Sequence, residues 1–468
     1  RGPALFILTL FAAAATACGG GGGSASVAGV APGNGAPGPT ASPRATPTGA
    51  PTATPGPGST PSTGSTMIAD TTGRVGLFQE FDRGMTSSQI VSDAPHYDAV
   101  WGANSPQLWH SVNPSVVTSR YFIPQEDRSQ LSGHDLTWWQ TNHPDWILYA
   151  CKADGTPTHD FAYWAGVDKP DVPLDQHNPA VIDYQVRQLN GMNAIANGDQ
   201  ALAVDQIVFE DAMVGGNPNF GQSVKSGEYA CGIWNGATFV RRYSGVHDPA
   251  WTADMIAFVK ATRQIVTTDS TLAPYHLKVI VNHPPGPMSN PNEQTLLQYI
   301  DGMVDEAGYA NYARYNTSVD KNLFAFTAAY LVALQKRKIA AFIINSFKDA
   351  AVTPLQREYA VATYFMSDQG GQDMYVSPGP GGSQENFPEY SVRLGQPCED
   401  FHGGPYLYER RYSGGLVLVN SGSLPAAFVD ASLPDNHTYT DIEGRKVTNP
   451  LPVASSDAYV LTTTNGCS

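Results

Sequence analysis

The segment DQIVFED, residues 205–211, ends a short apolar run with two adjacent acids, Glu210 and Asp211. Its apolar residues have the composition of a buried strand. The segment DGMVDEAGY, residues 301–309, repeats the arrangement about a hundred residues later. Acids that stand where a strand stops, and not within it, indicate chemistry at one edge of a sheet.

The chain around these segments alternates apolar runs with stretches of helical periodicity. Helical spacing begins at Asn178 and at Asp248, each followed by proline, and again before and after residue 338. Eight strands interleaved with helices are typical of a (β/α)8 TIM barrel in the α/β class. The predicted strands are residues 74–81, 97–103, 116–124, 206–211, 276–283, 302–308, 338–347 and 373–379.

Two regions depart from the barrel pattern. Residues 125–178 are too long for one connection, and they predict a hairpin or short sheet at the barrel mouth. After residue 380 short strands are broken by Gly, Asn, Asp and Pro, with turns near residues 413–415 and 443–444. This pattern favours a small all-β sandwich. The predicted domains are a barrel over 67–380 and a sandwich over 381–468.

The first 66 residues do not have the composition of a folded domain. Residues 4–18, ALFILTLFAAAATAC, resemble a secretory signal that ends in a lipoprotein cleavage box with Cys18 as the lipidated residue. An ordinary secretory signal is the alternative. Residues 19–66 are mostly Gly, Pro, Ser, Thr and Ala, which predicts a disordered spacer. We therefore expect an extracytoplasmic protein anchored to a membrane surface, or else a secreted one.

Cysteine usage agrees with an oxidising compartment. Besides Cys18 the chain has four cysteines, an even number that predicts two disulfides. Four cysteines allow three pairings. Pairing within each predicted folded region favours Cys151 with Cys231, and Cys398 with Cys467.

Charge and motifs exclude several functions. The 468 residues carry 42 acids and 27 bases, a net charge of −15, with no basic footprint for nucleic acid. The sequence has no HExxH, no GxSxG and no CxxC, and its glycine-rich stretches follow no strand. We therefore expect neither a catalytic metal nor a cofactor, and an uncharged partner such as a polysaccharide.

The acids gain meaning from the predicted barrel, where the carboxyl ends of all strands meet on one face. Glu210 and Asp211 close the fourth strand, and Asp305 and Glu306 the sixth. Hydrolysis of a glycosidic bond uses two facing carboxylates. Because side chains alternate along a strand, we predict Glu210 and Glu306 as the pair, with Asp211 and Asp305 as second choices. Capping of the following helices is the alternative role.

Other residues at or near strand ends suit a sugar-binding mouth. Flat aromatic rings stack on the apolar faces of sugars, and amide or imidazole groups bond hydroxyls. Packing or loop support is the alternative for each of them. The candidates are Trp101, Tyr121, Tyr149, Asn282, His283 and Asn345.

The chain resembles a group of bacterial hypothetical glycoside hydrolases that are distantly similar to the endo-α-1,4-polygalactosaminidases. The resemblance covers about residues 70–380, and its motifs are HPDWILYACKADG, VPLDQHNPAV, VDQIVFEDA, CGIWNG, VNHPPG and DGMVDEAGY. It implies a barrel with acids at the ends of strands four and six, here Glu210 and Glu306. A lipid-anchored protein that binds a glycan or solute without cutting it is the alternative function.

Overall fold

The structure is a computed structural model that describes residues 68–467 with gaps. The gaps are residues 83, 123, 125, 129–133, 163–170, 190–205, 210–226, 246–247, 307, 310–320, 348–350, 378–386, 405, 422–427 and 435. The predicted signal segment with Cys18, the predicted spacer, and Glu210 and Asp211 therefore lie outside the described residues.

Eight parallel strands form the largest sheet, in the order β1-β2-β3-β8-β11-β12-β13-β14. Each predicted barrel strand supplies one of them, so the prediction of eight strands in this region is confirmed. Their bounds are Phe78–Glu80, Ala99–Trp101, Val117–Phe122, Gln206–Phe209, Lys278–Asn282, Gly302–Asp305, Ala340–Ser346 and Gln372–Ser377.

The first and last strands of this order also meet. Leu77, just before β1, forms a parallel bridge with Met374 of β14. The backbone N–H of Met374 donates to the carbonyl of Gly76 at 2.9 Å. The sheet therefore curls until its two ends are in contact.

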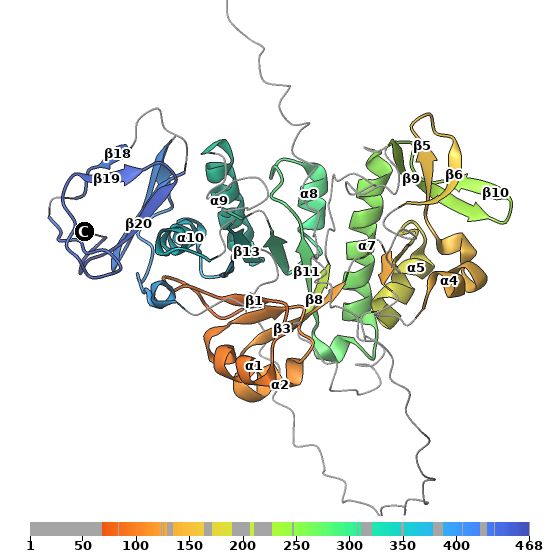
Figure 1. Cartoon of the computed structure of the whole chain (residues 1–468), viewed down its shortest axis with the longest axis horizontal. Helices are drawn as coiled ribbons and strands as arrows, with labels where there is room; N and C mark the ends of the chain where they lie inside the picture. The colour runs from red at the N-terminus through yellow and green to blue at the C-terminus, as the bar shows by residue number, and fades with distance from the viewer. Residues whose placement is uncertain are drawn as a thin grey trace, which may run out of the picture. The chain divides into compact units, whose positions relative to one another are not determined.

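Helices connect consecutive strands of this sheet. They are α1 (Ser87–Asp93), α2 (Pro106–Val112), α7 (Pro249–Thr268), α8 (Pro291–Leu296), α9 (Lys321–Lys336) and α10 (Pro354–Ser367). The predicted start at Asp248 is confirmed, because its side chain accepts from the N–H of Ala250 at 2.9 Å. Helix α7 lies against β11, and α9 against β13 (Figure 1).

The two faces of the sheet bury different sets of residues. One face packs against the helices through residues such as Val281, Met303 and Ile343, and we call it the helix face. The other, which we call the inner face, packs almost entirely on itself. Its cluster comprises Ile68, Phe78, Ala99, Trp101, Ile280, Val304, Ala340, Phe342, Ile344 and Tyr375. The faces alternate residue by residue along each strand, so the parity of a strand-end residue indicates its face.

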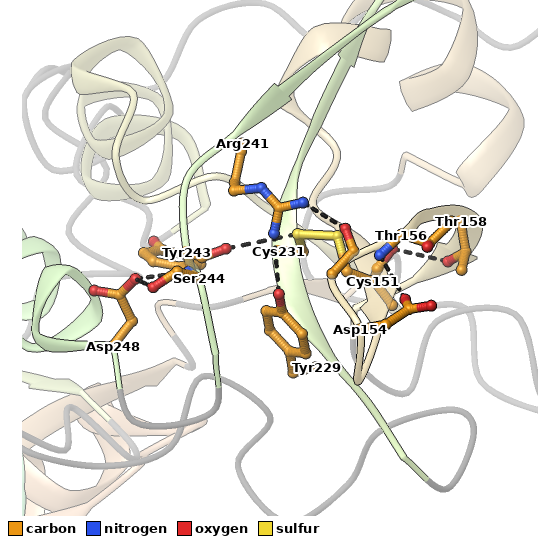
Figure 2. Close-up of a disulfide and its surroundings, with 12 residues drawn as sticks. Cys151, Asp154, Thr156, Thr158, Tyr229, Cys231, Arg241, Tyr243, Ser244 and Asp248 are labelled. Atoms are coloured by element: carbon orange, nitrogen blue, oxygen red, sulfur yellow. Dashed lines mark hydrogen bonds between the residues drawn. A yellow bond between two sulfur atoms is a disulfide. The ribbon is translucent and has the colours of Figure 1, made fainter.

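The long connection after β3 and the one after β8 build a second, antiparallel sheet in the order β10-β9-β5-β6. Cys151 of β5 is bonded to Cys231 of β9, which confirms this predicted disulfide (Figure 2). Beside it, Arg241 donates to the Tyr229 hydroxyl at 3.0 Å and to the Gly155 carbonyl (Figure 2). The strands are β5 Tyr149–Lys152, β6 Pro157–Phe161, β9 Glu228–Asn235 and β10 Thr238–Arg241.

Smaller elements complete the region between β3 and β8. Strands β4 (Glu126–Arg128) and β7 (Asp171–Pro173) pair as a ribbon, and α4 (Leu136–Asn142) and α5 (Pro179–Tyr184) lie in the same stretch. A π-helical turn at Gln185–Leu189 extends α5. Single 3-10 turns lie at Ala94–His96, Pro144–Trp146, Ala273–Tyr275 and Pro388–Ser391.

The C-terminal part is all β within its described residues. A four-stranded antiparallel sheet comprises β15 (His402–Gly403), β16 (Leu407–Tyr412), β17 (Gly415–Asn420) and β20 (Asp457–Thr462). A ribbon of β18 (Phe428–Ala431) and β19 (Leu451–Ala454) shares a core with one face of that sheet. The Cys398–Cys467 disulfide is present as predicted.

The other face of this C-terminal sheet packs on α10. The guanidinium of Arg410 is buried there and donates to the carbonyls of Phe365, Met366 and Asp368 at the end of the helix. Tyr412 donates to the Phe365 carbonyl at 2.6 Å. Because these bonds cross residue 380, the domain boundary drawn there stays a prediction.

Candidate active site

Carboxylates from the first and the sixth strand of the order lie at the carboxyl ends of these strands. Glu80 is the last residue of β1, and Glu306 directly follows β12. Glu80 has the parity of Phe78, and Glu306 has the parity of Val304, both of which belong to the inner face. The two carboxylates therefore extend from the inner face. Asn282, the last residue of β11, has the same parity through Ile280.

The surroundings of Glu306 favour its neutral form. Burial and, after it, the negative charge of Glu80 together raise the pKa of Glu306 to about 7. The neighbouring Asn282 amide lowers it, and the charge of Asp305 adds a smaller increase. A carboxylic acid that still carries its proton near neutral pH can act as a general acid.

Glu80 sits beside a strained backbone position. Phe81 has a φ of 55°, in the left-handed region that a bulky side chain rarely adopts. Its N–H donates to the Trp101 carbonyl at 2.7 Å, and its ring stacks on that of Trp101. The Gln79 amide donates to the carbonyls of Glu80 and Phe81 at 2.9 and 3.0 Å. Such strain persists where the surrounding contacts enforce it, and it is common at functional sites.

Asp82 ties the loops that follow β1 and β2 together. It is buried and accepts from the backbone N–H groups of Asn104 and Ser105 at 2.7 and 2.9 Å. The Trp109 indole donates to it at 3.1 Å. The end of β1, and with it Glu80, is therefore held from several sides.

Glu80 is not among the acids predicted from the sequence. The strand prediction at 74–81 included this residue, but only paired acids were considered as candidates. A single acid at the end of a predicted barrel strand is the signal that would have identified it.

The other acids considered from the sequence are placed differently. Asp305 is the last residue of β12 and has the parity of Met303, which lies on the helix face. Glu210 and Asp211 lie outside the described residues, so their pairing with Glu306 stays a prediction.

Two of the six sugar-binding candidates lie with the carboxylates at the strand ends of the inner face. Asn282 ends β11 opposite Val304 of β12, two residues before Glu306. Trp101 ends β2 on the inner face, but its side chain is only 3% exposed and contacts Phe81. Tyr121 lies in β3, the third strand of the large sheet. A role of Asn282, Trp101 and Tyr121 in sugar binding stays a prediction.

The remaining candidates lie elsewhere. His283 has the helix-face parity of Val281 and lies 2.9 Å from Glu293. Asn345 accepts from the backbone N–H of Tyr309 at 2.9 Å, as a residue that supports a loop does. Tyr149 belongs to the inserted sheet, where it is buried beside Phe161.

The described residues contain few features of other kinds of site. No cluster of His, Cys, Asp or Glu there has the arrangement of a metal site. No described helix combines the length and apolar character needed to cross a membrane. A pocket of about 410 Å³ lies between α5 and α7, beside Arg187, and is not lined by the strand-end acids.

No protein-family model matches the chain, and no curated protein matches it in sequence. Among solved structures, it is similar to a noncanonic maltogenic α-amylase from Thermotoga neapolitana, with TM-score 0.42, 11% identity, and coverage of 83% of this chain and 98% of that chain. A β-L-arabinopyranosidase from Geobacillus stearothermophilus is similar with TM-score 0.44 and 9% identity, and the match covers 84% of this chain and 97% of that chain. An α-xylosidase from Xanthomonas citri is similar with TM-score 0.43 and 8% identity, and the match covers 85% of this chain and 47% of that chain.

Proposed function

We propose that this protein is a glycoside hydrolase in which Glu306 donates the proton to the leaving oxygen. The observation that carries the proposal is the pair of Glu306 and Glu80 at the strand ends, with the pKa of Glu306 raised to about 7 by burial and by the charge of Glu80. Two carboxyl groups held in different protonation states are what glycosidic bond cleavage requires.

Each group then has a distinct task. Glu306 transfers its proton to the glycosidic oxygen as the bond to the anomeric carbon breaks. A carboxylate on the other side either attacks that carbon or removes a proton from the attacking water. Glu80 is the described residue suited to this second role, because its charge acts directly on Glu306. The predicted partner Glu210 is the competing candidate.

The proposal includes a (β/α)8 barrel as the frame. Support comes from the parallel order of eight strands, the bridge between Leu77 and Met374, and an inner face that packs on itself. In such a barrel, β1 and β12 reach the same open face.

We place this activity outside the cytoplasm, on a protein anchored through Cys18 to the cell surface or the periplasmic face of a membrane. Support comes from the signal-like segment 4–18 and the spacer 19–66. The two disulfides fit the same compartment. The substrate proposed is a polysaccharide or oligosaccharide.

A release screen tests the activity. The purified protein is incubated with a panel of polysaccharides, and reducing ends are measured for the wild type, Glu306→Gln and Glu80→Gln. Glu358→Gln is the matched control, since it removes another carboxyl with a raised pKa, at the contact between α10 and β20. We expect both site variants to lose activity by about a hundredfold or more while the control retains it. Undiminished turnover by Glu306→Gln would remove this residue from the chemistry, and glycan binding without any cleavage by the wild type would favour a binding protein.

A further inference from the structure

Three polar side chains meet on the helix face behind the candidate site. His283 follows β11, Glu293 comes from α8 and Tyr330 from α9. His283 Nε2 lies 2.9 Å from Glu293 Oε2, and the Tyr330 hydroxyl donates to Glu293 Oε1. All three side chains are at least 97% buried. Hydrogen bonds between buried polar side chains are strong in their low-dielectric surroundings, so these two contacts hold the three side chains together.

Glu293 is the charged centre of this cluster. Burial works against its charge, but hydrogen bonding from His283, the charge of that imidazole and the Tyr330 hydroxyl together leave the pKa of Glu293 below its ordinary value. Burial and the charge of Glu293 raise the pKa of Tyr330, so the phenol stays a neutral donor. Each oxygen of Glu293 therefore has its own partner.

The cluster is linked to the strand ends through the backbone. The N–H of His283 donates to the Val304 carbonyl at 3.0 Å, two residues before Glu306. On the other side, His283 directly follows Asn282, which pairs with Val304 in the adjacent strand and has the inner-face parity that Glu306 shares. One residue thus connects α8 and α9 to the ends of both β11 and β12.

The turn after His283 also packs closely on Glu293. A Cβ atom at Gly286 would lie 2.5 Å from Glu293 Oε2, so a side chain there would displace the carboxylate from its partners. The turn that leaves β11 is therefore fitted to the carboxylate.

We propose that His283, Glu293 and Tyr330 are positioning residues, which fix the ends of β11 and β12 from the helix face and thereby hold Asn282 and Glu306 in place on the inner face. His283 thus acts through its neighbour and does not contact the sugar. The inference rests on the proposed function for its catalytic consequence, but the position of Asn282 against Glu306 can be measured without a substrate.

The test is a titration of Glu306 by carboxyl-carbon NMR on protein labelled at glutamate, with the signal assigned by its loss in Glu306→Gln. It compares the wild type with Glu293→Gln and Tyr330→Phe, of which the second removes a single oxygen atom. Because the Asn282 amide lowers the pKa of Glu306, loosening it should raise the titration midpoint by about half a pH unit or more. Asn282→Ala should raise the Glu306 midpoint at least as far. The double variant Tyr330→Phe with Asn282→Ala should have the same midpoint as Asn282→Ala alone, because both changes act through the same amide.

Matched controls separate positioning from general packing. Tyr412→Phe removes another buried hydroxyl, and Glu358→Gln another partly buried carboxyl, both at contacts between α10 and the C-terminal sheet. We expect neither control to move the Glu306 midpoint, although Tyr412→Phe should lower the melting temperature. If Tyr330→Phe and Glu293→Gln behave like the controls, the cluster only supports packing and the inference is wrong. If the midpoint moves but no glycan is cleaved by the wild type, the positioning network stands and the proposed function fails.

Discussion

Phe81 stacks on Trp101 with ring centroids 5.4 Å apart and planes inclined by 23°, directly after the carboxylate of Glu80. The contact joins the ends of β1 and β2 and holds Phe81 in a left-handed conformation. The position of Glu80 therefore depends on Phe81, an apolar residue that cannot take part in proton transfer.

Replacing Phe81 separates strain from stacking. Glycine accepts a φ of 55° without steric cost, whereas alanine does not. We expect Phe81→Gly to be more stable than Phe81→Ala by on the order of 1 kcal/mol, measured by urea unfolding. Both variants lose the ring and should lose activity. Equal stability of the two would show that the backbone strain is absent.

Activity should depend on pH through Glu306. A proton donor works only while it is protonated, so kcat/KM should fall as pH rises above about 7, where burial and the charge of Glu80 place the pKa of Glu306. Glu80→Gln removes that charge and should move the Glu306 titration midpoint to lower pH. An unchanged midpoint in Glu80→Gln would contradict the pairing of these two residues.

Stability should fall as pH rises from mildly acidic to neutral. Burial raises the pKa of Glu358 to about 7 from an ordinary 4.5, and that of Asp368 to about 6 from 3.8. The folded protein then binds more protons than the unfolded chain, and this contribution is lost as pH rises through the folded values. Urea midpoints at pH 5 and pH 8 should differ less in Glu358→Gln than in the wild type. If the urea midpoints at pH 5 and pH 8 differ by the same amount in both proteins, Glu358 is not a cause of the pH dependence of stability.

Each disulfide should contribute measurably to stability. The bonds link residues 80 and 69 positions apart, so each restricts a long loop of the unfolded chain. We expect Cys151→Ser with Cys231→Ser, and separately Cys398→Ser with Cys467→Ser, to lower the free energy of unfolding by about 2–4 kcal/mol. Denaturant unfolding of the oxidised proteins measures this. A loss near zero for either pair would mean that its loop is ordered before the bond forms.

The strands of the large sheet could be predicted because their signal is local. Apolar runs such as that of β13, buried along its whole length, stand out from the flanking polar residues. The disulfide pairs followed from the same division of the chain. The strand parity that assigns Glu306 to the inner face was also readable from the alternation around Val304.

The partner of Glu306 could not be predicted in the same way. Glu80 is separated from it by more than two hundred residues, and only the curl of the sheet brings Glu80 near enough for its charge to raise the pKa of Glu306. His283 presents the opposite problem. Its place at a strand end suggested a sugar ligand, but one step along the strand reverses the face, and α8 and α9 supply partners that the local sequence does not reveal.

Helix α10 has consequences for how the protein can be divided. Its residues Tyr359–Ser367 are all buried, because the helix is enclosed by the large sheet on one side and by β17 and β20 on the other. A chain ended at residue 380 would open that apolar surface to water and leave the carbonyls bonded by Arg410 without a donor. Such a fragment should self-associate in solution, and the part of the molecule that holds Glu80 and Glu306 is therefore not a detachable module.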